Sequence, residues 1–259
     1  MVDLRDSGSR WWGRSAFGLL SRLFSVLAVP GAARAVATWR PPSLASFQVL
    51  SALVPAAGDL KTIIDAGANV GQFARAATMT FPEAAIYCFE PLPEAAEELK
   101  RNLRDRPQVK VIQTALASAD GVATLYPNEY SQASSLLHLR KEGGPLLPGL
   151  RELEPIQVRT ARLDSLLAGE DLRRPMLLKL DLQGYEVEAL RGAPETLRKT
   201  EYVVVEIAFD ASYEGEPTFE TVSELLVKES FHFERVLNFN RDRRGSIFQM
   251  DALFARAGT

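Results

Sequence analysis

The sequence has one cysteine, two histidines and no apolar run long enough to span a bilayer. Cys88 has no second cysteine to pair with, which excludes a disulfide-stapled fold and predicts a reducing compartment, the cytoplasm. Because histidines are so few and no metal ligands cluster at the usual spacing, the sequence predicts no metal site. A spanning helix needs about 20 apolar residues, and Arg22 and Pro30 interrupt the most apolar stretch.

A large excess of either charge is also missing. The 259 residues include 30 basic and 33 acidic side chains, for a net charge of −3. Nucleic-acid-binding proteins usually present a strongly basic surface, so this balance argues against a nucleic-acid partner. The chain is 46% hydrophobic and 24% charged, which excludes a disordered or collagen-like protein. Its length suits one large domain or at most two small ones.

The N-terminal part of the chain has a different charge balance. Residues 1–60 contain six arginines and three acidic residues, a net charge of +3, so the remaining residues sum to −6. Apolar residues recur at helical spacing among these arginines, which predicts a basic amphipathic helix over residues 10–28. We therefore expect a helical extension over residues 1–45 and a separate domain over residues 46–259.

Three interpretations of this extension stay open. It could pack on the domain or on a second copy in a homodimer. It could instead lie as a peripheral helix on the inner face of the membrane, where arginines favour anionic lipids. A cleaved signal peptide is the third interpretation, although Arg22 interrupts the apolar stretch that such a segment needs.

From residue 61, short apolar runs alternate with helical patterns. The predicted strands cover residues 62–66, 85–90, 109–114, 176–181 and 202–207, and the predicted helices cover 72–81, 93–104, 186–191 with 195–199, and 219–230. Near-continuous apolar strands separated by helices are typical of a mostly parallel sheet that is covered on both faces. Two later runs, 232–237 and 247–254, are joined by a polar turn and predict a terminal hairpin with one antiparallel strand.

Residues 115–175 interrupt this alternation. A strand is expected over Val122–Tyr126, with Ile156–Thr160 as its partner. The segment between them, about residues 127–157, is long and rich in Gly, Pro and Ser. A connection of this length is usually a functional lid or a binding loop, or else disordered, and we expect a lid.

The first candidate binding element is the turn that follows the strand at residues 62–66. Its sequence DAGANVG places Asp65 at the strand end and Gly67, Ala68, Asn69 and Gly71 before a helix. Glycines let a ligand approach the backbone, and the helix N-terminus offers N–H groups. The dinucleotide pattern G-x-G-x-x-G is absent, and a carboxylate here would repel a pyrophosphate. Asp65 suits a ligand with an ammonium group; an ordinary turn capped by Asn69 is the alternative.

A second acidic residue ends the next strand. Glu90, followed by Pro91, lies 19 residues after Gly71. A carboxylate at this place can accept hydrogen bonds from both hydroxyls of a ribose. Together, Asp65 and Glu90 indicate a nucleoside that carries a cationic amino-acid tail, and S-adenosylmethionine fits that description.

The third candidate element is LLKLDLQGYEVEALRGA, residues 177–193. Ligands of open parallel sheets bind beyond the carboxyl ends of the strands, so Asp181 should share a crevice with the two acidic residues above. Lys179 points to the same side of the strand, and its burial is costly unless it pairs with Asp181 or Glu206. The arrangement is either a structural ion pair or a catalytic carboxylate beside a lysine.

Six motifs resemble, in order and spacing, the FkbM family of S-adenosylmethionine-dependent methyltransferases over about residues 60–210. They are IIDAGANVGQF, FEP, ALASADGVATLY, SSL, TARLDSLL and LLKLDLQGYEVEALRGA. The resemblance implies a class I methyltransferase fold, a Rossmann-like α/β domain with a seven-stranded, mostly parallel sheet, helices on both faces and an antiparallel last strand. It also implies O-methylation of a hydroxyl on a sugar, a glycan or a secondary metabolite.

The resemblance also assigns residues to the cofactor. By position it implies that S-adenosylmethionine is bound by Asp65, Gly67, Ala68, Asn69, Gly71, Glu90 and Pro91, with Ala115 and Leu116 beside the adenine. Many members have Glu at the position of Gln183, and Gln is a familiar variant there. The expected partner is a small-molecule or glycan acceptor.

Methyl transfer to a hydroxyl needs a group that takes up the hydroxyl proton. Asp181, beside Lys179, is the first candidate for this base, and His138 in the predicted lid is the second unless it is a solvated loop residue. A divalent metal held by Asp181 and Glu206 is an alternative way to bind an acceptor. Two other functions stay open, a non-catalytic nucleoside-binding or scaffold protein and an NAD-type oxidoreductase; Asp65 counts against the oxidoreductase.

Overall fold

The computed structural model describes residues 44–140, 150–241 and 245–258. The helix expected over residues 10–28, and with it nearly all of the predicted extension, lies outside the described residues. So does the middle of the predicted lid, residues 141–149. Within the described part of the chain, no helix has both the length and the apolar composition that a bilayer crossing requires.

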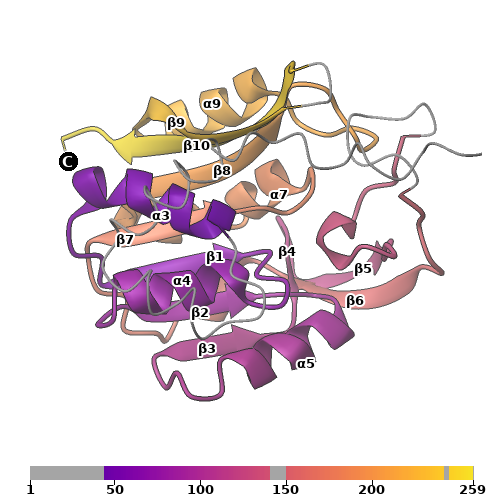
Figure 1. Cartoon of the computed structure of the whole chain (residues 1–259), viewed down its shortest axis with the longest axis horizontal. Helices are drawn as coiled ribbons and strands as arrows, with labels where there is room; N and C mark the ends of the chain where they lie inside the picture. The colour runs from indigo at the N-terminus through magenta and orange to yellow at the C-terminus, as the bar shows by residue number, and fades with distance from the viewer. Residues whose placement is uncertain (1–43, 141–149, 242–244, 259) are drawn as a thin grey trace, which may run out of the picture.

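A seven-stranded sheet in the order β3-β2-β1-β7-β8-β10-β9 forms the centre of the molecule (Figure 1). Its strands are β1 (Thr62–Ala66), β2 (Ala85–Phe89), β3 (Val109–Ile112), β7 (Met176–Leu180), β8 (Tyr202–Ala208), β9 (Phe231–Arg241) and β10 (Ile247–Arg256). The first five of these are parallel, whereas β10 runs antiparallel to both of its neighbours. Strands are added on one side of β1 and then on the other, and ligands of such sheets bind at this crossover.

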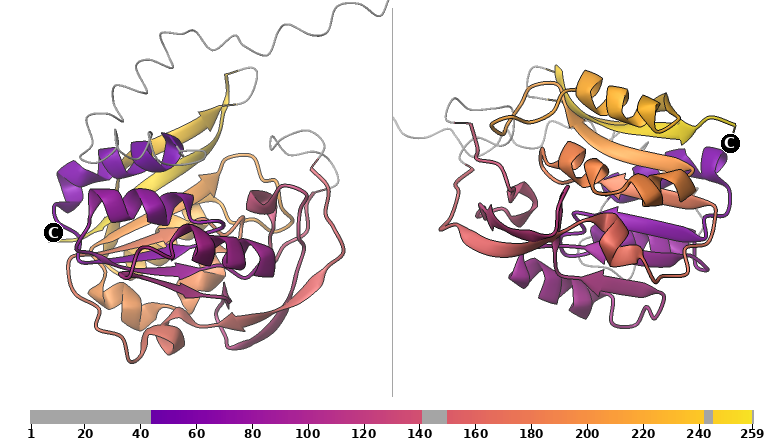
Figure 2. Two further views of the ribbon diagram at one scale, coloured as in Figure 1. Left: turned by 60° about the horizontal axis from the view of Figure 1, so that its bottom comes forward. Right: turned by 180° about the vertical axis from the view of Figure 1, so that it is seen from behind.

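Helices cover both faces of the sheet (Figure 2). On one face lie α3 (Leu44–Ala57), α4 (Gln72–Thr80) and α5 (Pro93–Asn102), whose apolar side chains form one core with strand residues such as Ile63 and Leu177. On the other face lie α6 (Leu163–Leu167), α7 (Glu186–Arg191), α8 (Pro194–Lys199) and α9 (Phe219–Lys228). Every residue of β1 and β7 is therefore buried, which explains their near-continuous apolar sequences.

A smaller sheet stands beside the central one (Figure 1). It has the order β4-β6-β5, with β4 at Ala115–Leu116, β5 at Gly121–Leu125 and β6 at Ile156–Ala161. β5 and β6 pair antiparallel, which confirms the predicted pairing of these two segments. Between them in the sequence lies a short 3-10 helix, η1 (Ser131–Ala133).

The predicted fold class is confirmed, and the local differences include two helices and the extent of the edge strand. α3 was not expected because it has no charged residue, and so lacks the polar face by which a surface helix is recognised. α6 was not expected because five residues are too few to show a helical period. β9 runs to Arg241 and so includes residues 238–241, which the sequence analysis placed in the hairpin turn.

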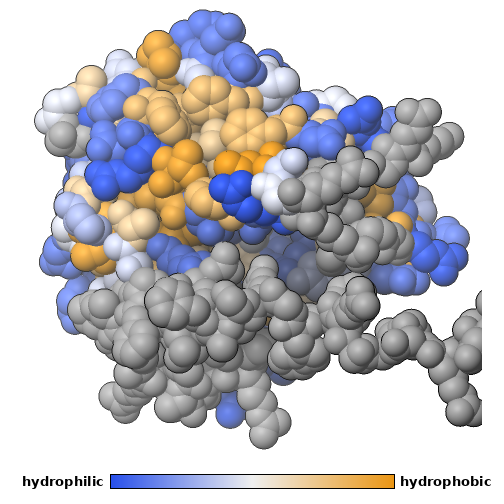
Figure 3. Space-filling view, turned by 45° about the horizontal axis from the view of Figure 1, so that its top comes forward, coloured by the Kyte–Doolittle hydropathy of each residue, from blue (hydrophilic) through white to orange (hydrophobic). Residues whose placement is uncertain are grey.

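Large apolar side chains stay exposed beside the edge strand β9. Val227 of α9 and Phe233, Val236 and Phe239 of β9 are each more than 40% exposed. Figure 3 shows an apolar area among polar side chains on this side of the molecule. Because β9 ends the strand order, its outer edge has no partner strand among the described residues.

Candidate active site

A cavity of about 650 Å³ opens beyond the carboxyl ends of β1, β2, β7 and β8. Small-molecule sites commonly have volumes of about 300–1,000 Å³. Its wall is formed by the turns after β1 and β2, β4, residues 130–136 around η1, the segment after β7, the first turns of α3 and the terminal hairpin. The crossover of the sheet thus brings distant parts of the chain to one site.

The turn after β1 is shaped by Gly67. Its φ of 78° lies in the left-handed region, and a Cβ at this position would stand 1.8 Å from the backbone oxygen of Asp181. Only glycine therefore lets the turns after β1 and β7 approach so closely. Asn69 also has a positive φ, 46°, and its Nδ2 donates to Oγ of Ser131 at 3.1 Å, which ties the turn to η1.

The backbone N–H groups of this turn already have acceptors. Those of Gly67 and Ala68 both donate to the carbonyl of Phe89 at 3.0 Å, and that of Asn69 donates to Oε2 of Glu90 at 2.8 Å. A dinucleotide site uses such N–H groups for the pyrophosphate. Because these N–H groups are already engaged, they argue against a dinucleotide ligand, as the glycine spacing does.

Glu90 is the acidic group in the half of the cavity that is formed by the turns after β1 and β2. It lines the wall although it is only 7% exposed, and its Oε1 accepts the N–H of Leu92 at 2.9 Å. Burial raises the pKa of Glu90 to about 7, against the effect of its two backbone donors. Each carboxylate oxygen keeps a further lone pair for a hydroxyl. Pro91, Ala115 and Leu116, which were predicted to contact the cofactor, also line the cavity.

Two residues of the predicted motif lie behind the cavity wall. Gly71 precedes α4 with a φ of 94°, and a Cβ there would stand 2.6 Å from Cδ1 of Leu99, so this glycine serves the packing of α4 against α5. Asp65 is fully buried. Burial raises the pKa of Asp65, while the ammonium group of Lys179 acts to lower it. An ammonium group does contact Asp65, but it belongs to the chain itself.

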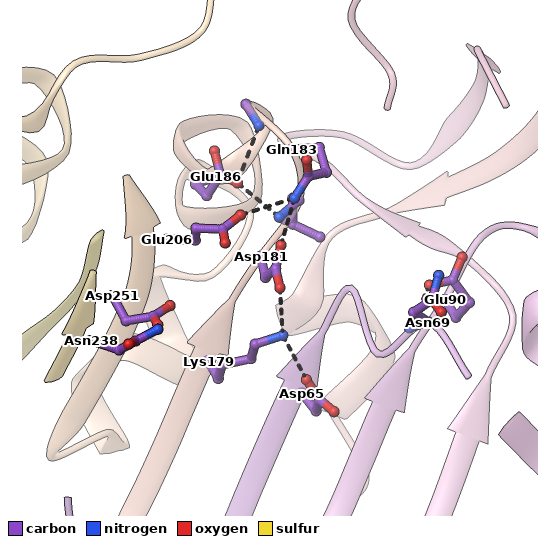
Figure 4. A network of polar contacts seen from close by, with 12 residues as sticks. Asp65, Asn69, Glu90, Lys179, Asp181, Gln183, Glu186, Glu206, Asn238 and Asp251 are labelled. Atoms are coloured by element: carbon purple, nitrogen blue, oxygen red, sulfur yellow. Dashed lines mark hydrogen bonds and ion pairs between the residues drawn. The ribbon is translucent and has the colours of Figure 1, made fainter. Parts of the chain in front are cut away.

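Lys179 stands between two carboxylates (Figure 4). Its Nζ lies 3.3 Å from Oδ1 of Asp65 and 3.2 Å from Oδ2 of Asp181. Burial alone would lower the pKa of Lys179, but the carboxyls of Asp181, Asp65 and Glu206 raise it above its ordinary value. The lysine is therefore a permanent positive charge. The predicted pairing with Asp181 is confirmed, and its second partner is Asp65.

Asp181 and Glu206 are two carboxyls that the side chain of Gln183 bridges. Nε2 of Gln183 donates to Oδ1 of Asp181 at 2.8 Å and to Oε2 of Glu206 at 2.9 Å (Figure 4). Burial, reinforced by the charge of Asp181, raises the pKa of Glu206 well above its ordinary value. Burial also acts to raise the pKa of Asp181, but Lys179 and the hydrogen bonds of Glu206 and Gln183 outweigh it, and that pKa is lowered. Asp181 is therefore ionised at neutral pH, and of the two carboxyls Glu206 is the one that binds a proton more readily.

The terminal hairpin, β9 and β10, carries a further row of polar side chains next to Glu206. Asn238 of β9 and Glu206 of β8 are both register partners of Asp251 on β10. Nδ2 of Asn238 donates to Oδ2 of Asp251 at 3.1 Å, and Nδ2 of Asn240 donates to Oε1 of Gln249 at 2.9 Å. Burial raises the pKa of Asp251 to about 6, although Asn238 acts in the opposite direction. All four hairpin side chains line the cavity, and Figure 4 shows Asn238 and Asp251 on the side away from Glu90.

His138 is not part of this site. Its side chain is 51% exposed, its Nδ1 lies 3.3 Å from Oε2 of Glu152, and its ring centroid lies 3.7 Å from that of Tyr126. The imidazole contacts Glu152 and Tyr126, and His138 is not among the described residues that line the cavity, so its role as the second candidate base stays a prediction that this geometry does not support. Other described lid residues do line the cavity, namely residues 130–136 and Leu150.

Several side chains at the site escaped the sequence analysis. Asn238 was missed because it was placed in a turn. Asp251 had the same signal as Lys179, a lone charge in an otherwise apolar strand. Tyr213 had no signal; its hydroxyl lies 3.0 Å from both the carbonyl of Ala133 and Oε1 of Gln183. Among the described residues, no group of three or more His, Cys, Asp or Glu side chains is arranged to hold a metal ion.

Comparison with known proteins decides among the functions left open by the sequence. The model of the methyltransferase FkbM domain matches residues 65–239, which is more than half of the chain. The chain belongs to the FkbM methyltransferase family. It is an S-adenosylmethionine-dependent methyltransferase, so the predicted family, enzyme class and cofactor are confirmed.

Relatives of this methyltransferase include a 2-O-methyltransferase and a hexuronic acid methyltransferase. The 2-O-methyltransferase NoeI of Sinorhizobium fredii is 29% identical over 196 residues, which cover 71% of this chain and 77% of NoeI. The hexuronic acid methyltransferase AglP of Haloferax volcanii is 25% identical over 171 residues, 65% of each chain. Among solved structures, magnesium protoporphyrin IX methyltransferase from Synechocystis PCC 6803 aligns with a TM-score of 0.46 and 13% identity over 83% of this chain and 81% of its own.

The residues around the cavity fit the cofactor of this family. Glu90 offers a buried carboxylate with lone pairs left for hydroxyl donors, and Ala115 and Leu116 offer an apolar wall beside it. The close approach at Gly67, which any Cβ would prevent, keeps the turn after β1 against the turn after β7.

Proposed function

We propose that this methyltransferase acts on a hydroxyl of a sugar, a glycan or a secondary metabolite. The observation that carries the proposal is the position of Asp181, an ionised carboxylate on the cavity wall between the Glu90 half and the polar row of the hairpin. The names of NoeI and AglP, a 2-O-methyltransferase and a hexuronic acid methyltransferase, support an oxygen acceptor.

The cofactor is held by the turns after β1 and β2. Glu90 accepts hydrogen bonds from the ribose hydroxyls, Pro91, Ala115 and Leu116 flank the adenine, and Gly67, Ala68 and Asn69 face the amino-acid part. Asp65 acts through Lys179, which it holds in place, and Gly71 acts through the packing of α4. When bound, S-adenosylmethionine supplies an electrophilic methyl group on a sulfonium.

Asp181 orients the acceptor and receives its proton. Lys179 and Gln183 hold its carboxylate, so an oxygen lone pair stays directed at the acceptor hydroxyl and aligns it for attack; such positioning can supply several kcal/mol. The hydroxyl becomes strongly acidic as its oxygen forms the new bond to carbon. A carboxylate of lowered pKa is therefore basic enough to accept the proton at or after attack.

The substitution Asp181→Asn tests this role, because it keeps the shape of the side chain and removes its charge. Loss of a general base typically slows turnover by about 10²–10⁴-fold, and we expect that loss with little change in cofactor affinity. Release of S-adenosylhomocysteine in the presence of a glycoside panel measures the first quantity, and calorimetric titration with S-adenosylmethionine the second. Asp120→Asn, at an exposed turn away from the cavity, is the matched control. Normal turnover of Asp181→Asn would make Asp181 structural.

A further inference from the structure

The cavity has a half that the proposed cofactor contacts leave free. Its wall comes from the first turns of α3 and from the terminal hairpin, and includes Ser46, Val49, Asn238, Asn240, Gln249 and Asp251. The sheet register joins this half to Asp181, because Asp251 is the partner of Glu206, and Gln183 bridges Glu206 to Asp181. A molecule in this half therefore reaches Asp181 directly.

The side chains of this half suit groups that both donate and accept hydrogen bonds. Asn238 is paired with Asp251, and Asn240 with Gln249, each through a single N–H of the asparagine amide. Each pair keeps a second N–H donor and further acceptor lone pairs. Hydroxyl groups, which donate and accept, match such pairs better than a purely anionic or a purely apolar group does.

The spacing of the strands suits two hydroxyls of one ring. Asp181 follows β7 and Asp251 lies on β10, with β8 between them. Two strand spacings place the two carboxylates roughly 9.5 Å apart. If each carboxylate accepts one hydrogen bond from the ligand, roughly 4 Å is left between the two bound hydroxyl oxygens. This is the scale of two hydroxyl oxygens on a single sugar ring.

The charges of the cavity oppose an anionic acceptor. Among the described residues that line it, Lys179 is the one cation, whereas Asp181, with its lowered pKa, and Asp251, with a pKa of about 6, both carry a negative charge at pH 8. Lys179 is already held between Asp65 and Asp181. A carboxylate on the acceptor would thus approach the negative charges of Asp181 and Asp251. The described residues of the wall offer no further cation with which it could pair.

We infer that the acceptor is an uncharged sugar ring, that the Asn238–Asp251 pair binds a second hydroxyl of that ring, and that the site discriminates against uronic acids. This inference rests on the proposed function and narrows it. It also separates this chain from AglP, which is by name a hexuronic acid methyltransferase.

Matched glycosides test the inference on the full-length enzyme. p-Nitrophenyl glycosides of neutral hexoses and 6-deoxyhexoses are compared with the corresponding hexuronides. Saturation-transfer NMR with S-adenosylhomocysteine measures binding, and product release with S-adenosylmethionine measures turnover. We expect at least one neutral glycoside to bind and to be methylated, with kcat/KM at least about tenfold above that of its hexuronide. Equal or better use of a hexuronide, or no binding of any neutral glycoside, would overturn the inference.

Cofactor titration on the same samples separates this result from the proposed function. If S-adenosylmethionine does not bind, the proposed function fails. If it binds and a hexuronide is preferred, only the inference about the acceptor fails.

The substitution Asp251→Asn isolates the residue that sets the preference. Removing this charge should raise the hexuronide-to-hexoside ratio of kcat/KM by roughly tenfold, because a like charge no longer faces the uronate. Asp210→Asn changes the net charge equally at an exposed position outside the cavity and should leave the ratio unchanged. An unchanged ratio in Asp251→Asn, at unchanged cofactor affinity, would remove Asp251 from the acceptor site.

Discussion

Glu90 shows how one residue combines burial with hydrogen bonding. Its side chain is almost inaccessible, and both carboxylate oxygens accept backbone N–H groups, from Leu92 and Asn69. Burial nevertheless raises its pKa to about 7. The protonation state of Glu90 therefore changes close to neutral pH. The affinity of any ligand that prefers the ionised form must then depend on pH in the same range.

We expect cofactor affinity to depend on pH through Glu90. Ribose hydroxyls donate to the ionised carboxylate, so binding favours that form. Below pH 7 the free protein must first lose the proton, and affinity should fall by up to about tenfold per pH unit, whereas above pH 8 it should level off. Calorimetric titration with S-adenosylhomocysteine between pH 5.5 and 8.5 measures this.

The substitution Glu90→Gln provides the comparison. It should weaken binding at least about tenfold at pH 8, because charge-assisted hydrogen bonds are lost, and it should flatten the pH dependence. Glu97→Gln, on the exposed side of α5, is the control. Identical pH profiles for the native protein and Glu90→Gln would contradict the assignment.

At the scale of elements, the lid and the turn after β7 are joined by hydrogen bonds. The hydroxyl of Tyr213 lies 3.0 Å from the carbonyl of Ala133 in η1 and 3.0 Å from Oε1 of Gln183. Oγ of Ser135 donates to the carbonyl of Gln183 at 2.7 Å. Because Gln183 also holds Asp181 and Glu206, the position of η1 is linked to that of the Asp181 carboxylate.

Removal of the Tyr213 hydroxyl should weaken this link. Tyr213→Phe leaves a buried carbonyl and amide oxygen without their donor, and we expect the free energy of unfolding to fall by about 1–3 kcal/mol. We also expect a lower kcat/KM for the acceptor, since Gln183 becomes less restrained. Urea unfolding and steady-state kinetics measure the two effects.

Tyr202→Phe is a matched control for this experiment. The hydroxyl of Tyr202 donates to the carbonyl of Ala56 at 2.6 Å, and Tyr202 lies at the start of β8, at the opposite end of the sheet from the cavity. It should show a similar loss of stability with unchanged kinetics. Equal kinetic effects of the two substitutions would mean that Tyr213 has no specific role at the site.

At the scale of the whole molecule, buried acids determine how stability depends on pH. Burial raises the pKa of Glu90 and of Glu186 to about 7, that of Asp251 to about 6, and that of Glu206 well above its ordinary value. The folded chain therefore holds protons that the unfolded chain has already lost between about pH 4.5 and 7. Stability must then fall as the pH rises through this range.

Unfolding measurements should show this sign. Each group that retains a proton only in the folded state contributes up to about 1.4 kcal/mol per pH unit, so the free energy of unfolding should be lower at pH 8 than at pH 5.5. Glu186→Gln should reduce the slope without loss of cofactor affinity, since Glu186 is not among the described residues that line the cavity and Gln keeps an oxygen that can accept the N–H groups of Leu182 and Gly184. A flat or rising profile would contradict the sign.

Truncation of the N-terminal extension tests its predicted role. A chain that begins at Pro42 should keep its cofactor affinity, because the described residues that line the cavity begin at Ala45. We expect it to melt at a lower temperature or to dissociate from a dimer, since the predicted helix is short and carries modest charge. Unchanged melting together with lost co-sedimentation on anionic vesicles would instead indicate a membrane-surface helix.

The sequence by itself determined the main alternation of strands and helices from residue 61 onward, the family and the cofactor. These follow from local patterns: apolar runs buried on both faces of a sheet, glycines in the turn after β1, and acidic residues at the ends of β1, β2 and β7. Asp65, Glu90 and Asp181 could be singled out because the carboxyl ends of parallel strands meet at one edge.

Only the tertiary structure decided what these residues contact. It placed Lys179 against Asp65, bridged Asp181 to Glu206 through Gln183, brought Asp251 into register beside Glu206, and set His138 beside Glu152. Such contacts depend on strand order, on register and on the direction of each side chain in the folded chain. A local pattern carries none of this information, because a shift of one residue in register would move every side chain of a strand to the opposite face.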